Sequence, residues 1–360
     1  MCGSVTVLLQ HNTACGATEM EQLVSILIPA CNAEAWIAEC IESALAQTWP
    51  TKEIIVVDDG SRDSTLAIAS SFAASNVEVV AQAKRGASAA RNRALSLAQG
   101  EYIQWLDADD LLAPDSVARK LIAAEPGRDS RVLLSGAWGR FYHRADRARF
   151  VPSRLWEDLE PLEWLLRQAE EGLWMAIDSW LVSRRLTEMA GPWDESLTLN
   201  DDGEYFGRVV SCADTIRFVR ESRCYVRRGN SGLSSAGIFT PAKLESLWRS
   251  VSLNVSLLRG MQQGARVRSA CITVLQRWYL YFYPDRPHIM RDMESLAGSL
   301  GGRLTVPVLR PKYRWLQAVV GWKAARKAMF LVPAIRTIPT RQWERITRVL
   351  QGPRRARDWR

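Results

Sequence analysis

Long hydrophobic runs are missing from the sequence. No stretch of its 360 residues approaches the ~20 consecutive apolar residues that a membrane-spanning helix needs. Residues 1–22 also lack the basic start and apolar core of a secretory signal, so we expect them to form an N-terminal extension. These absences predict a cytoplasmic protein that does not thread a membrane.

Paired cysteines are missing as well. The sequence has seven cysteines, an odd number, and no two of them stand in a C-x-x-C arrangement. This spacing predicts neither a zinc site nor a disulfide framework, and it indicates reduced thiols. With 47% hydrophobic and 24% charged residues, and no internal repeat, the composition is typical of a globular enzyme and excludes a disordered chain.

Acidic residues are scarce at one end of the chain. Residues 310–360 contain fourteen Lys or Arg and two acids, a net charge of +12, so residues 1–309 carry −4 of the total of +8. Bulky apolar residues such as Trp315, Leu316 and Val319 recur between the basic ones at helical spacing. Residues 310–360 are therefore expected to form a basic amphipathic region. Three interpretations stay open: a peripheral helix on anionic lipid, a helical unit packed on the enzyme with a solvated basic face, or a nucleic-acid binding segment.

Strand and helix patterns alternate over the first 150 residues. Short apolar runs at 23–29, 53–57, 77–81, 102–106 and 132–138 are separated by helical patterns at 36–47, 63–72, 87–98 and 114–124. This alternation predicts a parallel sheet with right-handed helical crossovers. The pattern is mixed from 151 to 235, and residues 236–309 are expected to form a mostly helical subdomain.

Acidic residues follow two of the predicted strands, at the sheet edge where ligands bind in such folds. Asp107-Ala108-Asp109-Asp110 comes after the fourth strand, and Asp107 and Asp109 can converge because alternate residues of an extended segment point the same way. Mg²⁺ is commonly held by one or two carboxylates together with substrate phosphates. One interpretation is therefore a metal site, and the other is a turn or the N-cap of the helix near Pro114.

A second acidic segment, Asp58-Asp59-Gly60-Ser61, follows the second predicted strand. Asp-Gly is a strong turn signal, so this segment could be a turn and nothing more. Alternatively, Asp58 at the end of an inflexible strand could accept hydrogen bonds from a nucleobase N–H or a ribose, because a carboxylate accepts but does not donate.

Four stretches of the sequence resemble, in order and in spacing, the family-2 glycosyltransferases, which are inverting enzymes of the GT-A fold. The stretches are VSILIPACNAEAWIAECIESALAQTWPTKEIIVVDDGSRDST (24–65), GASAARNRAL (86–95), GEYIQWLDADDLLAPD (100–115) and GPWDESLTLNDDGEYFGRVV (191–210). The resemblance implies an α/β, Rossmann-like GT-A domain over residues 23–235, with a nucleotide-binding half at 23–125 and an acceptor half at 126–235. It does not extend over the C-terminal third.

The resemblance also implies roles on the donor side. Asp58 matches the acid that reads the nucleobase, usually uracil, while Asp107 faces the ribose and Asp109 the metal, Mg²⁺ or Mn²⁺. Arg227, Arg228 and Ser231 fall where the family often has a mobile basic loop over the diphosphate. The complete set of implied donor-binding residues is Pro29, Asn32, Asp58, Asp59, Arg91, Asp107, Arg227 and Arg228.

On the acceptor side, Asp202 matches the general base in the family's E-D-x-E element. That element here begins with Asp201, so the usual leading Glu is an Asp while the base is retained. Without the resemblance, Asp202 could also be an acid favoured by the dipole at a helix N-terminus, and a Trp could simply pack in the core. The acceptor and sugar pocket is expected to contain Asp201, Glu204, Trp180 and Trp193.

The expected activity is metal-dependent transfer of a sugar from a nucleotide-diphosphate donor, UDP being the family habit, to a hydroxyl of a glycan or lipid-linked acceptor. We expect it in cell-surface polysaccharide synthesis at the inner face of the cytoplasmic membrane, without nucleic acid. A single in-line displacement needs a base and a stabilised leaving group but no covalent nucleophile, in agreement with the absence of a G-x-S-x-G motif. The alternatives are a binding module that uses the basic C-terminal region, or a nucleotidyltransferase, although the loop after the first strand has no glycine for a phosphate loop.

Overall fold

Strand β1 (Val24–Ala30) is buried on both of its faces. The computed structural model describes residues 22–123, 131–228, 240–309, 311–336, 339 and 342–345. Within them, β1 pairs in parallel with β2 (Lys52–Asp59) and β4 (Tyr102–Trp105). Ile26 and Ile28 pack on one side of the sheet and Leu27 on the other. A strand covered on both faces needs apolar residues at successive positions, which explains the continuous hydrophobic run.

The described residues contribute nine strands to one sheet, in the order β3-β2-β1-β4-β8-β6-β9-β5, with β7 paired to β6. The other strands are β3 (Val77–Gln82), β5 (Leu111–Leu112), β6 (Val132–Phe141), β7 (Arg149–Phe150), β8 (Trp180–Ser183) and β9 (Thr215–Arg227). The first four strands in this order are parallel, as the alternation predicts. Beyond β4 the sheet is mixed, because β8 runs antiparallel between β4 and β6, which themselves run in the same direction. No single helical crossover joins β4 to β8, so the parallel direction is not imposed there.

Helices cover both faces of this sheet. On the face that carries Ile26 lie α1 (Ile37–Leu45), α2 (Thr65–Ser70) and α4 (Ser116–Ala123). On the face that carries Leu27 lie α3 (Ala87–Leu97), α5 (Pro161–Glu171), α6 (Arg184–Ala190) and α7 (Asp201–Cys212). Helices α1 to α4 fall within the ranges that the sequence predicts.

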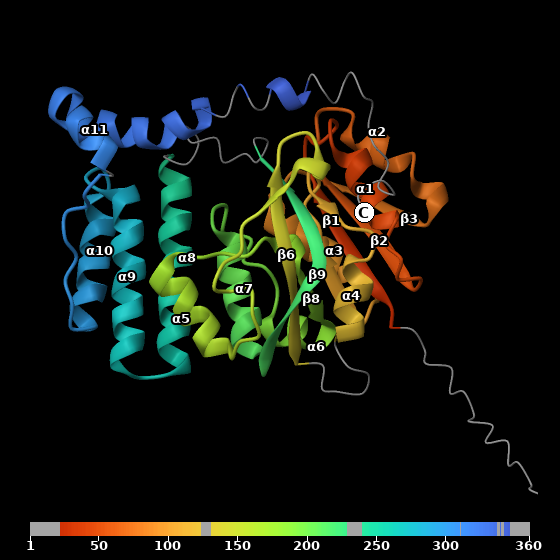
Figure 1. Ribbon diagram of the computed structural model, residues 1–360, viewed down its shortest axis with the longest axis horizontal. Coiled ribbons are helices and arrows are strands. Elements are labelled where there is room, and N and C mark those ends of the chain that lie inside the picture. Colours follow the sequence, from red (N-terminus) through yellow and green to blue (C-terminus); the bar gives the residue numbers. More distant parts are fainter. Residues whose placement is uncertain are drawn as a thin grey trace, which may run out of the picture.

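Three further helices extend the second face. Helices α8 (Pro241–Met261), α9 (Ala265–Phe282) and α10 (Pro287–Ser299) stand side by side next to α5 and α7 (Figure 1). They confirm the expected helical character of this region. They have no core of their own, because Leu244, Leu275 and Met293 belong to the same hydrophobic cluster as Trp105 and Tyr205.

Helix α11 (Pro311–Arg336) runs across the ends of α9 and α10 (Figure 1). It bends at Gly321, whose φ of 77° is a conformation that glycine adopts without strain. Buried Arg326 holds it in place by an ion pair of 2.6 Å to Asp285 and by donating to carbonyl oxygens at the end of α9, Leu280 and Tyr281 among them. Among the described residues, no helix combines the length and the apolarity of a membrane span.

Candidate active site

The carboxyl ends of β1, β2 and β4 meet at one edge of the sheet. Asp58 lies opposite Ala30 in the β1–β2 pairing, and Asp107 follows two residues after Trp105, which lies opposite Leu27. Acidic segments that are 49 positions apart in the sequence therefore share one edge, as the predicted topology requires.

Asn32 joins the first two loops of this edge. Its backbone has a φ of 51°, in the left-handed region that Asn tolerates better than most residues. Its N–H donates to the Ser61 hydroxyl at 2.9 Å, and its side-chain oxygen accepts from the Arg62 N–H at 2.9 Å. Pro29 precedes it at the end of β1 and is half-buried. Asn32 thus holds the loop after β1 against the loop after β2, which directly follows Asp58 and Asp59.

The two adjacent aspartates at the end of β2 have different environments. Asp59 is satisfied within the protein, since it accepts hydrogen bonds from the Gln82 side chain and from the Arg85 and Gly86 N–H groups, each at 2.8 Å. Asp58 accepts one bond, from the Ser61 N–H at 3.0 Å, and its other oxygen is buried without a partner among the described residues. A buried carboxylate oxygen without a donor is costly, and it suits a ligand that brings an N–H or O–H group.

Arg91 connects the D-x-D segment, Asp107-Ala108-Asp109, to helix α7. Its guanidinium, whose side chain is 8% exposed, donates to Asp107 at 3.0 Å and to Asp201 at 2.7 Å. The guanidinium also lies over the Trp193 ring, 4.5 Å from the centroid. These carboxylates raise the pKa of Arg91 further above its ordinary value, against the opposing effect of burial. One side chain therefore fixes the relative position of the two acidic motifs that the sequence singles out.

The carboxylate of Asp109 receives no side-chain hydrogen bond from any described residue. Burial and the nearby Asp107 charge raise the pKa of Asp109 to about 6, while Arg227 opposes this rise. Arg227 itself is buried: it donates to the Asp109 carbonyl at 2.8 Å, pairs with Glu39 at 2.9 Å and lies 4.0 Å from the Trp36 ring centroid. It supports the D-x-D backbone in this conformation. Arg228 is exposed at the end of the described segment, and Ser231 lies outside the described residues.

A buried carboxyl pair adjoins the D-x-D segment, and sequence reasoning missed one of its members, Asp178. Asp178 is fully buried and accepts the Asp107 N–H at 2.8 Å, while Asp110 accepts the Arg227 N–H at 2.6 Å. Burial and the surrounding carboxylates raise the pKa of Asp178 to about 7 and that of Asp110 well above its ordinary value. Only the tertiary structure could reveal Asp178, because its own segment carries no motif.

Asp202 lies in the first turn of α7. Burial and the Asp201 charge raise its pKa to about 6, and its carboxylate accepts the Gly203 N–H at 2.8 Å. The preceding Asn200, with a φ of 58°, exchanges hydrogen bonds of 2.6 and 2.8 Å with Ser250 of α8. A Cβ at Gly203 would lie 2.6 Å from the Asn200 side chain, so glycine is the residue that permits this approach. Helix α8 therefore helps to position Asp202.

The other residues expected in the acceptor pocket have different roles. Glu204 is buried and pairs with Arg208 at 2.7 Å within α7. Trp193 is buried, stacks on Tyr205 with centroids 3.9 Å apart, and does not line the pocket described below. Trp180 is buried and stacks on Phe206, but it does contribute to the pocket wall.

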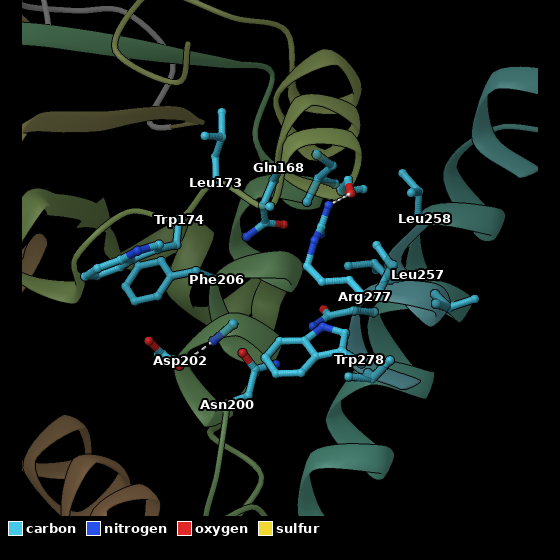
Figure 2. A pocket seen from close by; sticks show the side chains of 18 of the residues that line it. Gln168, Leu173, Trp174, Asn200, Asp202, Phe206, Leu257, Leu258, Arg277 and Trp278 are labelled. Carbon is cyan, nitrogen blue, oxygen red and sulfur yellow. Dashed lines mark hydrogen bonds between the residues drawn. The ribbon is translucent and has the colours of Figure 1, made fainter. Parts of the chain in front are cut away.

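A pocket of about 520 Å³ opens next to Asp202, between α5, α7, α8 and α9. Figure 2 shows Asp202 and Asn200 facing Arg277 and Trp278 across this space, with Trp174 and Leu173 from the loop after α5 at its side. Trp174 is 41% exposed, an unusual value for so large an apolar side chain. The sequence around Trp278 is rich in aromatic residues, but it does not indicate which of them line a cavity.

The acidic edge fits a divalent cation of the kind that the resemblance implies. Among the described residues, no three His, Cys, Asp or Glu side chains cluster as a complete metal site. Mg²⁺ and Mn²⁺ are commonly held by one or two carboxylates plus substrate phosphates, and Asp109 offers a carboxylate without a competing side-chain donor. Asp109, and not a full protein cage, is therefore the group that would hold the ion.

Comparison with known proteins finds a family match in the first half of the chain. Residues 25–149 match the model of "Glycosyl transferase family 2". The Bacillus subtilis (strain 168) protein "Uncharacterized glycosyltransferase EpsJ" is 29% identical over 66% of this chain and 70% of its own length. Chondroitin synthase of Escherichia coli is 45% identical over 26% of this chain, but the matched segment is only 14% of that protein.

A solved structure shows the same fold. The crystal structure of S. aureus TarS residues 1–349 in complex with UDP-GlcNAc superposes with a TM-score of 0.60 at 18% identity, covering 77% of this chain and 80% of that one. This match includes helices beyond the segment that the family model covers. The D-x-D edge, the acidic start of α7, the family match and the shared GT-A fold lead to one conclusion: the protein is a glycosyltransferase whose residues 25–149 form a family-2 domain.

Proposed function

We propose that the protein transfers a sugar from a nucleotide-diphosphate donor, with UDP favoured, to an acceptor hydroxyl with inversion, in the synthesis of a surface polysaccharide. The matched relatives include a chondroitin synthase, and the structural neighbour holds UDP-GlcNAc. The observation that carries the proposal is the Arg91 bridge, which places the D-x-D segment and the start of α7 on either side of one guanidinium.

The donor would lie along the edge formed by β1, β2 and β4. The unpartnered oxygen of Asp58 would accept from the nucleobase, Asp107 would face the ribose, and Asp109 would hold the Mg²⁺ or Mn²⁺. When bound, the divalent ion offsets the charge of the departing diphosphate. Pro29 and Asn32 would shape the wall beside the nucleotide.

Asp202 would act as the general base. A base must be within hydrogen-bond reach of the proton it removes. Asp202 lies next to Asp201, whose ion pair with Arg91 connects it to the donor edge, and Asp202 also lines the adjoining pocket. A pKa of about 6 leaves this carboxylate ionised at neutral pH while making it more basic than an ordinary Asp. The acceptor hydroxyl would lose its proton to Asp202 as its oxygen attacks the anomeric carbon.

Thermal-shift measurements with a panel of nucleotide sugars and Mn²⁺ test the donor site. One donor should raise the melting temperature of the wild type by mass action. Asp58→Asn should weaken this shift, and Asp109→Asn should remove its dependence on Mn²⁺. Asp115→Asn is the matched control, because Asp115 is 42% exposed and pairs only with Arg119 among the described residues. A panel without any shift, or equal shifts in all variants, would contradict the donor assignment.

We further propose that α11 rests on an anionic membrane surface, where a lipid-linked acceptor would be found. Trp315, Val319 and Val320 are 65%, 73% and 48% exposed, although their helix packs on α9 through its other face. Lys312 and Arg314 are exposed in the same part of the helix. Basic residues beside exposed Trp and Val suit the interface of an anionic bilayer.

Co-sedimentation with phosphatidylglycerol and phosphatidylcholine vesicles tests this surface. The wild type should sediment with the anionic vesicles only, and a Trp315→Ser/Val319→Ser variant should lose most of that binding. Ile122→Ser, at a residue 72% exposed on α4, is the control for removing a surface apolar group. Equal sedimentation of the double variant would contradict the proposal, and RNA binding without vesicle binding would support the nucleic-acid interpretation instead.

A further inference from the structure

The pocket beside Asp202 has a composition that is unusual for a site that binds only carbohydrate. Of the 25 residues that line it, five carry an amide, carboxylate or guanidinium group: Gln168, Asn200, Asp202, Asn254 and Arg277. A sugar ring buries several hydroxyl groups, and each needs a hydrogen-bond partner when it leaves water. The pocket therefore offers a ligand more apolar surface than hydrogen-bonding groups.

The apolar lining comes mainly from helices outside the segment matched by the family model. Val251, Val255 and Leu258 of α8 are buried at 1–5% exposure, and Val274 and Trp278 of α9 lie across from them. Their aliphatic side chains and the rings of Trp164 and Trp174 make up much of the wall of the pocket, whose whole volume is about 520 Å³. Cavities of about 300–1,000 Å³ accommodate drug-sized ligands.

Arg277 is the one cation among the described lining residues. Its Nη2 donates to the carbonyl oxygens of Ala169 and Glu170 at 2.9 and 3.0 Å. Its guanidinium lies against Gly172, where a Cβ would come within 2.8 Å of Nε. Burial lowers the pKa of Arg277, so the site disfavours its charge and would gain from an anionic group on the ligand.

We infer that this pocket binds the apolar part of an amphiphilic acceptor, with the attacking hydroxyl at Asp202. The inference rests on the proposed function, since it assigns the acceptor class to the same base. Asp202 is the one acid among the described lining residues and stands at the side that adjoins the donor edge. An acceptor whose hydroxyl or first sugar is attached to a hydrocarbon or aromatic group would bury that group against α8 and α9. The hydrophobic effect would then hold the hydroxyl at the base.

Isothermal titration calorimetry with methyl, hexyl and octyl β-glucosides, each below its micelle concentration, tests this inference without requiring turnover. Affinity should rise with chain length, by up to about fourfold for each methylene that the pocket buries. Leu257→Trp, which fills the pocket from a half-buried position on α8, should abolish the chain-length dependence. Leu253→Trp is the matched control, because Leu253 is on the same helix but 38% exposed and not part of the lining.

Donor binding separates this inference from the proposed function. The thermal shift produced by the nucleotide sugar should be the same in Leu257→Trp, in Leu253→Trp and in the wild type. A normal donor shift without alkyl-chain dependence in the wild type would overturn the pocket assignment and leave the glycosyltransferase site intact. Chain-length dependence that survives in Leu257→Trp would place the alkyl group elsewhere and would also overturn it.

Discussion

Replacing Arg91 by Met should weaken both the fold and the donor site. The substitution removes a guanidinium that is 8% exposed and leaves Asp107 and Asp201, which are 36% and 20% exposed, facing each other without a cation. Removing one partner of a fully buried ion pair costs ~3–5 kcal/mol. Partial solvent contact of both carboxylates screens their repulsion, so we expect a loss of about 2–3 kcal/mol in the free energy of unfolding. That loss corresponds to a fall in melting temperature of roughly 3–4 °C for a chain of 360 residues.

Differential scanning calorimetry of three variants measures this effect. Arg91→Lys should recover part of the stability, because an ammonium keeps the charge but cannot make the forked contact to two carboxylates. Arg93→Met is the control for losing an Arg from the same helix, since Arg93 is exposed. If Arg91→Met melts within about 1 °C of Arg93→Met, the bridge does not hold the two motifs together and the reasoning is refuted.

Three further predictions follow from the same structure. The turnover rate should rise with pH through about 6 and level off above it, because Asp202 must be ionised to accept a proton. Burial and the Asp201 charge raise the pKa of Asp202 to about 6. A turnover rate that falls over this pH range would contradict the role of Asp202 as a base. Asp109→Asn should raise the melting temperature of the ligand-free protein above pH 6, where the charge of half-buried Asp109 destabilises the fold. The gain should shrink as the pH falls from about 6 and the carboxyl becomes protonated. A gain that is constant with pH would contradict this cause. Arg326→Met should accelerate chymotrypsin cleavage within α11, because it breaks the contact with Asp285, and an unchanged cleavage rate would show that α11 is held by other contacts.

The sequence predicts the donor half of the fold well because its signals are local. The apolar run of β1, the Asp pair at the end of β2 and the acidic residues after β4 each lie within a few residues, and a parallel sheet brings the strand ends to one edge. The antiparallel β8 is not predicted, because its four residues form a short apolar run without a directional signal.

The residues of the acceptor side are harder to predict from the sequence. Asp178 accepts a hydrogen bond from the Asp107 N–H, although the two residues are 71 positions apart in the sequence. The pocket is formed mainly by side chains from four helices that no local sequence pattern connects. A motif does not predict where each of its side chains points. Trp193 belongs to a segment of the family resemblance, yet its ring packs on Tyr205 in the core, where the Arg91 guanidinium covers it.

The most direct test of the central claim is the sugar-transfer rate of Asp202→Asn at saturating donor and Mn²⁺. The variant keeps the shape of the side chain and the N-terminal turn of α7 but cannot accept a proton as the carboxylate does. The account predicts a fall of about 10²–10⁴-fold in the turnover rate with an unchanged donor-induced thermal shift. A rate within about threefold of the wild type, with donor binding intact, would show that Asp202 is not the base.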